Sequence, residues 1–276
     1  MRSGFPSQGV VVRLNEPLAA HTASRTGGCC DAWVVVHRCE QFSAALAGCR
    51  VQGWSWRLLG AGTRTLVRDG GVRGAVISLG TDFCGIERRD DLWVIGAATP
   101  MPALMCVIRE QTGVLPLKLQ STPGSVGAAV VLDRELDGLW RQAIVWMRFL
   151  SRGRVVTGNF DEFMASKRRA LLAIGMDLRG LKQPARLVDA SHSSPWFRGQ
   201  AGSSVRAELR RAGMGEARLR RVAMLKQAPE LLVNLGGATA RDFELLHRSV
   251  LERCKASRGV ELHAQTRWLG QAGSRA

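Results

Sequence analysis

A chain of 276 residues is long enough for one large domain or about two to three small ones, and 46% hydrophobic with 22% charged residues is a globular composition. Lys and Arg number 39 against 23 Asp and Glu, which gives a formal net charge of +16. No run approaches the roughly 18 apolar residues that a membrane-spanning helix needs, and residues 1–21 contain no apolar stretch of signal-peptide length. We therefore expect a cytoplasmic protein without a membrane span.

The positive charge has two interpretations. It is either the solvated surface of an arginine-rich protein, or a set of guanidinium groups that collect phosphates. The run Arg206–Arg221 predicts a solvated helical face; because it has no interleaved aromatic residues, we do not expect a nucleic-acid partner despite the charge. The seven cysteines form no C-x-x-C pair, and we expect reduced thiols and no metal.

The first third of the chain predicts short strands around helices. Strands are expected at Ala32–His37, Trp56–Leu59, Ala75–Leu79 and Leu92–Ile95. Apolar residues at helical spacing predict helices at Cys39–Cys49 and Met101–Gly113.

Strands are also expected at 143–150 and 154–156, followed by a connection at Lys182–Pro195. From Ser203 onward the pattern is mainly helical, with helices at Val205–Ala212 and Ala240–Arg258, the strand-like Leu231–Asn234 between them and one last strand at Val260–Leu269. This order predicts an α+β protein with a break in composition near residue 195.

Glycine-containing loops are the clearest functional signal. The segment 59–66 follows a strand, but Thr65 stands where a Rossmann fingerprint needs its third glycine, so a Rossmann site is not expected. The small residues of this loop leave backbone amides and two hydroxyls to cradle a pyrophosphate, and Arg64 adds positive charge.

Two further loops have the same character. In Ser121–Ala129, Gly124 and Gly127 permit close backbone approach to a ligand, and Arg25–Gly28 is a third loop of this kind. Three such loops together predict an extended, phosphate-bearing ligand.

The order of these motifs resembles that of the MurB family, the FAD-dependent UDP-N-acetylenolpyruvoylglucosamine reductases. The resemblance is carried by PLA with Thr22, R-x-G-G at 25–28, LLGAGTRTLVRDGGVRGAVI at 58–77, TPGSVGAA at 122–129 and NLGGATARDFELLHRSVLERCKASRGVELHAQTRWLG at 234–270. It is colinear from about residue 13 to 270, nearly the whole chain.

The resemblance implies an FAD-binding fold of the vanillyl-alcohol-oxidase (PCMH) type, with FAD-binding α+β subdomains at 1–78 and 79–195 and a smaller α+β substrate domain at 196–276. It implies FAD as cofactor, NADPH as reductant and a UDP-sugar enol ether as substrate, in peptidoglycan precursor synthesis. The cofactor-binding residues that it implies are Gly60, Gly62, Thr63, Arg64, Thr65, Leu66, Pro123, Gly124, Ser125, Val126 and Gly127.

The same comparison assigns the catalytic positions and identifies departures from the family. The proton-donor serine corresponds to Ser203, and Ser166 and Arg206 correspond to substrate-binding positions. Met164 stands where the family has an arginine, and Gln265 where it has a glutamate, so a guanidinium and a carboxylate are missing. An amide can form hydrogen bonds but cannot deliver a proton at neutral pH.

These departures leave two hypotheses. Loss of one positioned donor commonly lowers turnover about 100- to 1000-fold. The chain is either a reductase in which Lys167 or Arg168 compensates, or a catalytically impaired paralogue that keeps the fold to bind a ligand or a protein partner.

Overall fold

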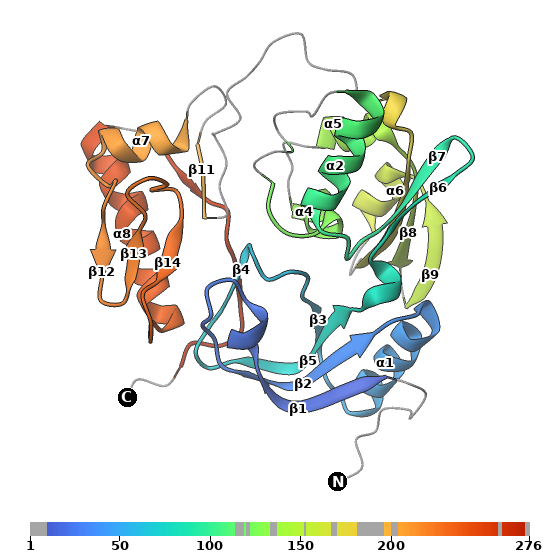
Figure 1. Cartoon of the computed structure of the whole chain (residues 1–276). Coiled ribbons are helices and arrows are strands. Elements are labelled where there is room, and N and C mark those ends of the chain that lie inside the picture. Colours follow the sequence, from blue (N-terminus) through green and yellow to red (C-terminus); the bar gives the residue numbers. More distant parts are fainter. Residues whose placement is uncertain are drawn as a thin grey trace.

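The computed structural model in Figure 1 describes residues 10–113, 119, 122–132, 137–151, 153–166, 170–180, 196–199, 204–258 and 261–273. The elements form three groups, each with a hydrophobic core of its own. Within these residues, no helix is both long and apolar enough to cross a membrane.

The first group is built on a four-stranded sheet. Its strand order is β1 (Val11–Pro17), β2 (Cys29–Val36), β5 (Val72–Leu79) and β3 (Trp56–Leu58), and only the β1–β2 pair is antiparallel. Helix α1 (Cys39–Val51) packs on β2, where Phe42 and Leu46 join a core with Val34 and Val36. The short helix η1 (Leu18–His21) follows β1.

The second group is a five-stranded antiparallel sheet with helices packed against it. The order is β6 (Ile86–Arg89), β7 (Leu92–Gly96), β10 (Ala170–Met176), β8 (Ile144–Ser151) and β9 (Arg154–Gly158). Its helices are α2 (Met101–Thr112), α4 (Val126–Leu132), α5 (Asp137–Ala143) and α6 (Phe160–Ala165), with short helices η2 (Thr81–Phe83) and η4 (Leu178–Gly180). They bury the core around Ile95, Leu104 and Trp140.

The third group, at the left of Figure 1, packs α7 (Val205–Arg211) and the long α8 (Ala240–Arg258) around a small sheet. That sheet has the order β12 (Arg218–Leu219), β13 (Val222–Met224) and β14 (Leu232–Asn234), and β11 (Phe197–Arg198) pairs separately with β15 (His263–Ala264). Phe243 and Val250 of α8 are fully buried in its core.

The end of the described chain returns to the first group. Strand β16 (Arg267–Leu269) pairs in parallel with β4 (Thr65–Val67), and further hydrogen bonds run from Arg68 N to Leu269 O (2.8 Å) and from Gly70 N to Gln271 O (3.1 Å). We call residues 64–71 and 267–273 together the β4–β16 ribbon. It ties the third group to the loop that precedes β4.

Most predicted elements are confirmed, and three predictions are wrong. The segment Val260–Leu269 holds two short strands, β15 and β16, with Gln265 and Thr266 between them. They are separate strands because β15 pairs with β11 and β16 pairs with β4. The expected helical face Arg206–Arg221 ends at Arg211, beyond which Gly213 takes a left-handed φ of 70°. The predicted loop Ser121–Ala129 ends at Ser125, because α4 begins at Val126. The predicted connection Lys182–Pro195 lies outside the described residues.

Candidate functional site: a cavity between the two sheets

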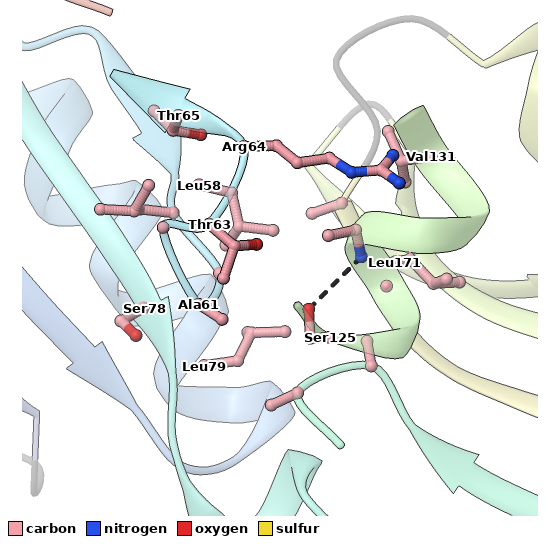
Figure 2. Close-up of a pocket in the computed structure, with 18 of the residues that line it drawn as sticks. Leu58, Ala61, Thr63, Arg64, Thr65, Ser78, Leu79, Ser125, Val131 and Leu171 are labelled. Atoms are coloured by element: carbon pink, nitrogen blue, oxygen red, sulfur yellow. Dashed lines mark hydrogen bonds between the residues drawn. The ribbon is translucent and has the colours of Figure 1, made fainter. Parts of the chain in front are cut away.

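A cavity of about 310 Å³ lies where the first and second groups meet. The loop after β3 forms one wall, and α4 with the start of β10 forms the opposite wall, as Figure 2 shows. Its lining residues are Leu58, Leu59, Gly60, Ala61, Gly62, Thr63, Arg64, Thr65, Ser78, Leu79, Ala97, Ala98, Ser125, Gly127, Ala128, Val131, Ala170, Leu171 and Arg267. Apolar side chains with a few polar groups are typical of a cofactor or small-molecule pocket.

The loop Gly60–Arg64 is shaped by packing on the chain behind it. Gly62 has a φ of 65°, and a Cβ there would lie 2.2 Å from the carbonyl oxygen of His21, so only glycine fits. Its own carbonyl accepts a hydrogen bond from Ala23 N (3.2 Å). In the described structure, the amides of Gly60, Ala61 and Thr63 donate to no protein acceptor. Backbone amides of this kind can bind phosphate oxygens.

The opposite wall corrects part of the sequence interpretation. The amides of Val126 and Gly127 were expected to serve a ligand, but they donate to the carbonyls of Thr99 and Ala97, both at 2.8 Å. A Cβ on Gly127 would lie 2.9 Å from the Ala97 oxygen, so this glycine permits packing of α4 on the chain after β7. The backbone amides of Val126 and Gly127 are therefore not available to a ligand in the cavity.

The two loops also approach one another closely. A Cβ on Gly124 would lie 2.7 Å from Thr63 Oγ1, and one on Gly60 would lie 3.2 Å from Ser125 Oγ. The small residues of both motifs thus set the width of the cavity.

Arginine 64 places a cation in the wall of this cavity. The residue is only 3% exposed, and Figure 2 shows its guanidinium extending toward Val131 of α4. Its carbonyl accepts a hydrogen bond from Arg267 N (2.8 Å), which fixes its backbone to β16, and Arg267 itself lines the cavity. The buried guanidinium gives this wall a positive charge, which suits an anionic ligand.

Seven of the predicted cofactor residues line the cavity: Gly60, Gly62, Thr63, Arg64, Thr65, Ser125 and Gly127. Four do not. Leu66 is fully buried in the third core and Val126 in the second, while Pro123 and Gly124 precede the lining segment of α4. The loop Arg25–Gly28 does not line the cavity either. A Cβ on Gly27 would lie 2.6 Å from Val67 Cβ, so this loop supports β4 from behind.

Met164 and Gln265, the two positions at which the resemblance predicts replaced catalytic residues, lie outside the cavity lining. Met164 is half-buried on α6, where it packs against the second core. Gln265 connects β15 to β16, and its backbone N–H donates to the carbonyl of Trp196 (3.0 Å). Ser203, and with it the predicted proton donor, lies outside the described residues, as do Lys167 and Arg168.

The two predicted substrate-binding residues have partners within the protein. The Ser166 hydroxyl donates to the carbonyl of Glu162 (2.9 Å) at the end of α6. Arg206 on α7 pairs with Glu230, with Nε 3.1 Å from both carboxylate oxygens. The Arg206 side chain is therefore held toward Glu230. Neither Ser166 nor Arg206 lines the cavity.

Sequence reasoning missed the apolar part of the site. Ser78, Leu79, Ala97 and Ala98 lie at the ends of β5 and β7, and Ala170 and Leu171 begin β10. The only local signal was a small or polar residue directly after an apolar strand.

None of the seven cysteines lines the cavity. Burial raises the pKa of the Cys30 and Cys49 thiols to about 11, so both are neutral at physiological pH. No group of three His, Cys, Asp or Glu side chains that could hold a metal ion occurs in the described ranges.

Known proteins are similar to this chain in sequence and in fold. A family model described as "FAD binding domain" matches residues 30–157, so this part of the chain is an FAD-binding domain. A UDP-N-acetylenolpyruvoylglucosamine reductase from Rubrobacter xylanophilus is 28% identical over 94% of this chain and 95% of the relative, and one from Pelobacter propionicus is 29% identical over 98% and 99%. Over nearly its whole length the chain is similar to these members of the MurB family.

The fold is that of a solved member. The crystal structure of MurB from Thermus caldophilus superposes with a TM-score of 0.67 at 21% identity, covering 95% of this chain and 99% of that one. The fold class predicted from the sequence is therefore confirmed.

Proposed function

We propose that this chain is an FAD-dependent reductase of UDP-N-acetylenolpyruvoylglucosamine, which uses NADPH and forms UDP-N-acetylmuramate in peptidoglycan precursor synthesis. The observation that carries the proposal is the cavity between the two sheets, with the Gly60–Thr63 amides and buried Arg64 on one wall. The function named for the relatives, which match 94% and 98% of this chain, supports it. We place the domains at 1–78, 79–195 and 196–276, and the protein in the cytoplasm.

The residues present fit FAD. The amides of Gly60, Ala61 and Thr63 would donate to the diphosphate, and the Arg64 guanidinium would offset its charge. The apolar side chains of Leu79 and Leu171 would cover the ring system. Bound FAD would supply hydride-transfer chemistry, while the protein supplies orientation and electrostatics.

The remaining chemistry requires a proton and control of negative charge. Ser203 would donate the proton. Gln265 can contribute a hydrogen bond but no proton, and Met164 contributes no charge. The two cations that line the cavity, Arg64 and Arg267, would therefore carry the electrostatic stabilisation of an anionic substrate.

Two measurements on the purified protein test the proposal. Addition of FAD should give a stoichiometric complex with quenched flavin fluorescence, and the enolpyruvyl substrate should then stimulate NADPH oxidation. Failure to bind FAD at any concentration would contradict the proposal as a whole.

A second candidate is a MurB-family protein that binds FAD and the UDP-sugar but does not turn it over. The packing of Met164 against the second core and the amide at Gln265 favour it. In that case the UDP-sugar would raise the melting temperature of the FAD complex without stimulating NADPH oxidation. Growth of a conditional reductase-deficient strain carrying this gene would decide between the two candidates.

A further inference from the structure

A second depression, of about 770 Å³, lies on the other side of the β4–β16 ribbon. It is lined by α8, by the turn between β12 and β13, and by the ribbon itself, through Arg68, Asp69, Arg220, Thr239, Arg241, Glu244, Leu245, Arg248, Ala272 and Gly273. We call it the basic pocket. Four of its lining residues are arginines, and they come from three segments that are distant in sequence.

Two of these arginines are held in place by acidic residues. Arg68 Nη2 lies 3.3 Å from Glu244 Oε1, and its guanidinium carbon lies 5.8 Å from the centre of the Trp268 ring. Arg220 Nη1 lies 3.1 Å from Oδ1 of Asp242, whose side chain is 6% exposed. Both guanidiniums are therefore fixed at the rim of the pocket.

Arg220 also has a strained backbone. Its φ is 50°, in the two-residue turn that joins Leu219 to Val222, a position at which glycine is preferred. Strain of this kind is retained where the side chain has a role that a glycine could not fill.

The other two arginines leave the pocket positively charged. Arg241 and Arg248 are both exposed on one face of α8, and no carboxylate among the described residues pairs with either. The Asp69 carboxylate instead accepts the amides of Ala240 (2.8 Å) and Arg241 (3.1 Å) at the start of α8. Because Asp69 already satisfies these helix amides, a ligand would meet guanidinium groups and not the helix N-terminus.

We propose that the basic pocket binds a compact polyphosphate group, such as a free diphosphate or the phosphate chain of a nucleotide, outside the FAD cavity. Guanidinium forks match tetrahedral oxyanions in geometry and charge. Its four arginines are gathered in one pocket, and among the described lining residues there is no aromatic ring on which bases could stack. These features favour a small anion over an extended nucleic-acid strand.

Occupancy of the pocket would stabilise the junction between α8 and the ribbon. Arg68 binds Leu269 through its backbone and Glu244 of α8 through its side chain, so both partners of the junction meet at one lining residue. An anion bound there bridges arginines of the ribbon and of α8. We expect the melting temperature to rise with its concentration.

The test is a calorimetric titration of the FAD-loaded protein with inorganic pyrophosphate, at low salt and without divalent cations. We expect one site per chain, and about tenfold or greater weakening of binding in the Arg241→Gln/Arg248→Gln double variant. The control is the Arg210→Gln/Arg253→Gln double variant. It removes the same charge from exposed positions on α7 and α8 that do not line the pocket, and its affinity should stay within about twofold of wild type.

Three outcomes would overturn the proposal. The first is equal affinity in both double variants, which would indicate a diffuse effect of net charge. The second is loss of binding in Arg267→Gln but not in Arg241→Gln/Arg248→Gln, which would place the anion in the FAD cavity. The third is tighter binding of a single-stranded oligonucleotide than of pyrophosphate, through the same two arginines.

The proposal is independent of the function of the cavity. If the chain binds no FAD, the same titration is carried out on the protein as purified, and the same variants give the answer. The source of the phosphate is then resolved by comparing free pyrophosphate with a nucleoside diphosphate. Tighter binding of the nucleoside diphosphate than of pyrophosphate would indicate a contact with Leu245, which is 36% exposed on α8 between Arg241 and Arg248.

Discussion

The proposed cofactor wall of the cavity and the predicted catalytic positions depend on different chemical groups. On the cofactor wall, the donors are the backbone amides of Gly60, Ala61 and Thr63, and packing fixes the backbone around them. At the catalytic positions the chemistry depends on side chains, and there Met164 and Gln265 carry neither of the charges that the family resemblance implies. Binding through the backbone tolerates sequence change, whereas catalysis through a charged side chain is lost in one substitution.

This difference makes FAD binding and turnover separable properties. A chain can keep the shape of the Gly60–Arg64 loop while the substrate side loses its charges. Variants of each region should therefore move different observables, and the four predictions below run from the largest expected effect to the smallest.

The largest effect is expected at Gly62. Substitution Gly62→Ala would bring a methyl group 2.2 Å from the His21 oxygen, a backbone atom that cannot move without displacing η1. We expect a loss of about 3 kcal/mol or more in the free energy of unfolding, together with loss of FAD binding. Chemical denaturation and FAD titration measure both.

Gly53→Ala is the matched control. Gly53 has nearly the same φ, 64°, but a Cβ there would have no atom within 4 Å. It should lose only about 1 kcal/mol, the cost of the left-handed conformation, and keep FAD binding. Equal losses in the two variants would mean that contact with η1 does not shape the loop.

The next prediction restores the catalytic charges. Met164→Arg with Gln265→Glu should raise substrate-stimulated NADPH oxidation about tenfold or more, and by more than either change alone, because both charges act on one substrate. Met164→Arg should also cost about 1 kcal/mol of stability, since Met164 packs against the second core.

Steady-state kinetics of the four proteins in this cycle, each loaded with FAD, provide the measurement. If the wild type already turns over at the usual enzymatic rate of about 1–1000 per second, the catalytically impaired alternative fails. If the double variant binds FAD but shows no gain, the substrate side of the cavity differs in more than these two charges.

Local pattern was sufficient for helices α1, α2 and α8 and for part of the cavity. The periodicity of α1, α2 and α8 and the glycine pattern of the Gly60–Arg64 loop are properties of short segments, and all four were located correctly. Helix α4 was missed because its glycine and alanine residues are equally typical of a loop, and it is held by bonds to Ala97 and Thr99.

The rest depends on contacts between distant segments. Arg68 and Glu244 are 176 residues apart, and the pairing of β16 with β4 joins residues 267–269 to residues 65–67. The backbone amides of Gly60, Ala61 and Thr63 donate to no described acceptor, whereas those of Val126 and Gly127 donate to Thr99 and Ala97. This difference depends on which segments pack against each loop, so the sequence could not predict it. The predicted roles of Ser203, Gln265 and Met164 stay predictions.

A smaller effect is expected from the charge on the cofactor wall. Arg64→Gln should weaken FAD binding roughly fivefold to tenfold, because it removes one buried cation while leaving the loop amides in place. Arg57→Gln, on the exposed face of β3, removes the same charge and should leave the affinity unchanged. Fluorescence titration with FAD measures the difference. An equal effect in both variants would assign it to net charge.

The smallest effect concerns the pH dependence of the third group. His247 is 3% exposed, and its Nε2–H donates to the Trp196 carbonyl (3.0 Å), the oxygen that also accepts the amide of Gln265. Burial lowers the pKa of His247 below its usual value near 6.5, against a smaller opposing effect of this hydrogen bond. The imidazole is therefore neutral in the folded protein at a pH where the unfolded chain binds a proton.

The sign of the pH effect follows from that difference. The contribution of His247 to stability is complete above about pH 6.5 and falls as the pH drops below this value, by at most about 1.4 kcal/mol per pH unit. His247→Phe preserves a ring against Phe197, stacked 4.9 Å from His247, and leaves the Trp196 carbonyl bonded to Gln265. Denaturant unfolding between pH 7.5 and about pH 5.5 should show a loss of up to about 1 kcal/mol in the wild type that is absent in this variant.

FAD affinity should change little over the same range, since His247 does not line the cavity. Parallel pH profiles for the two proteins would show that the imidazole is already protonated in the folded state, and Gln265 would then be anchored next to a charged ring.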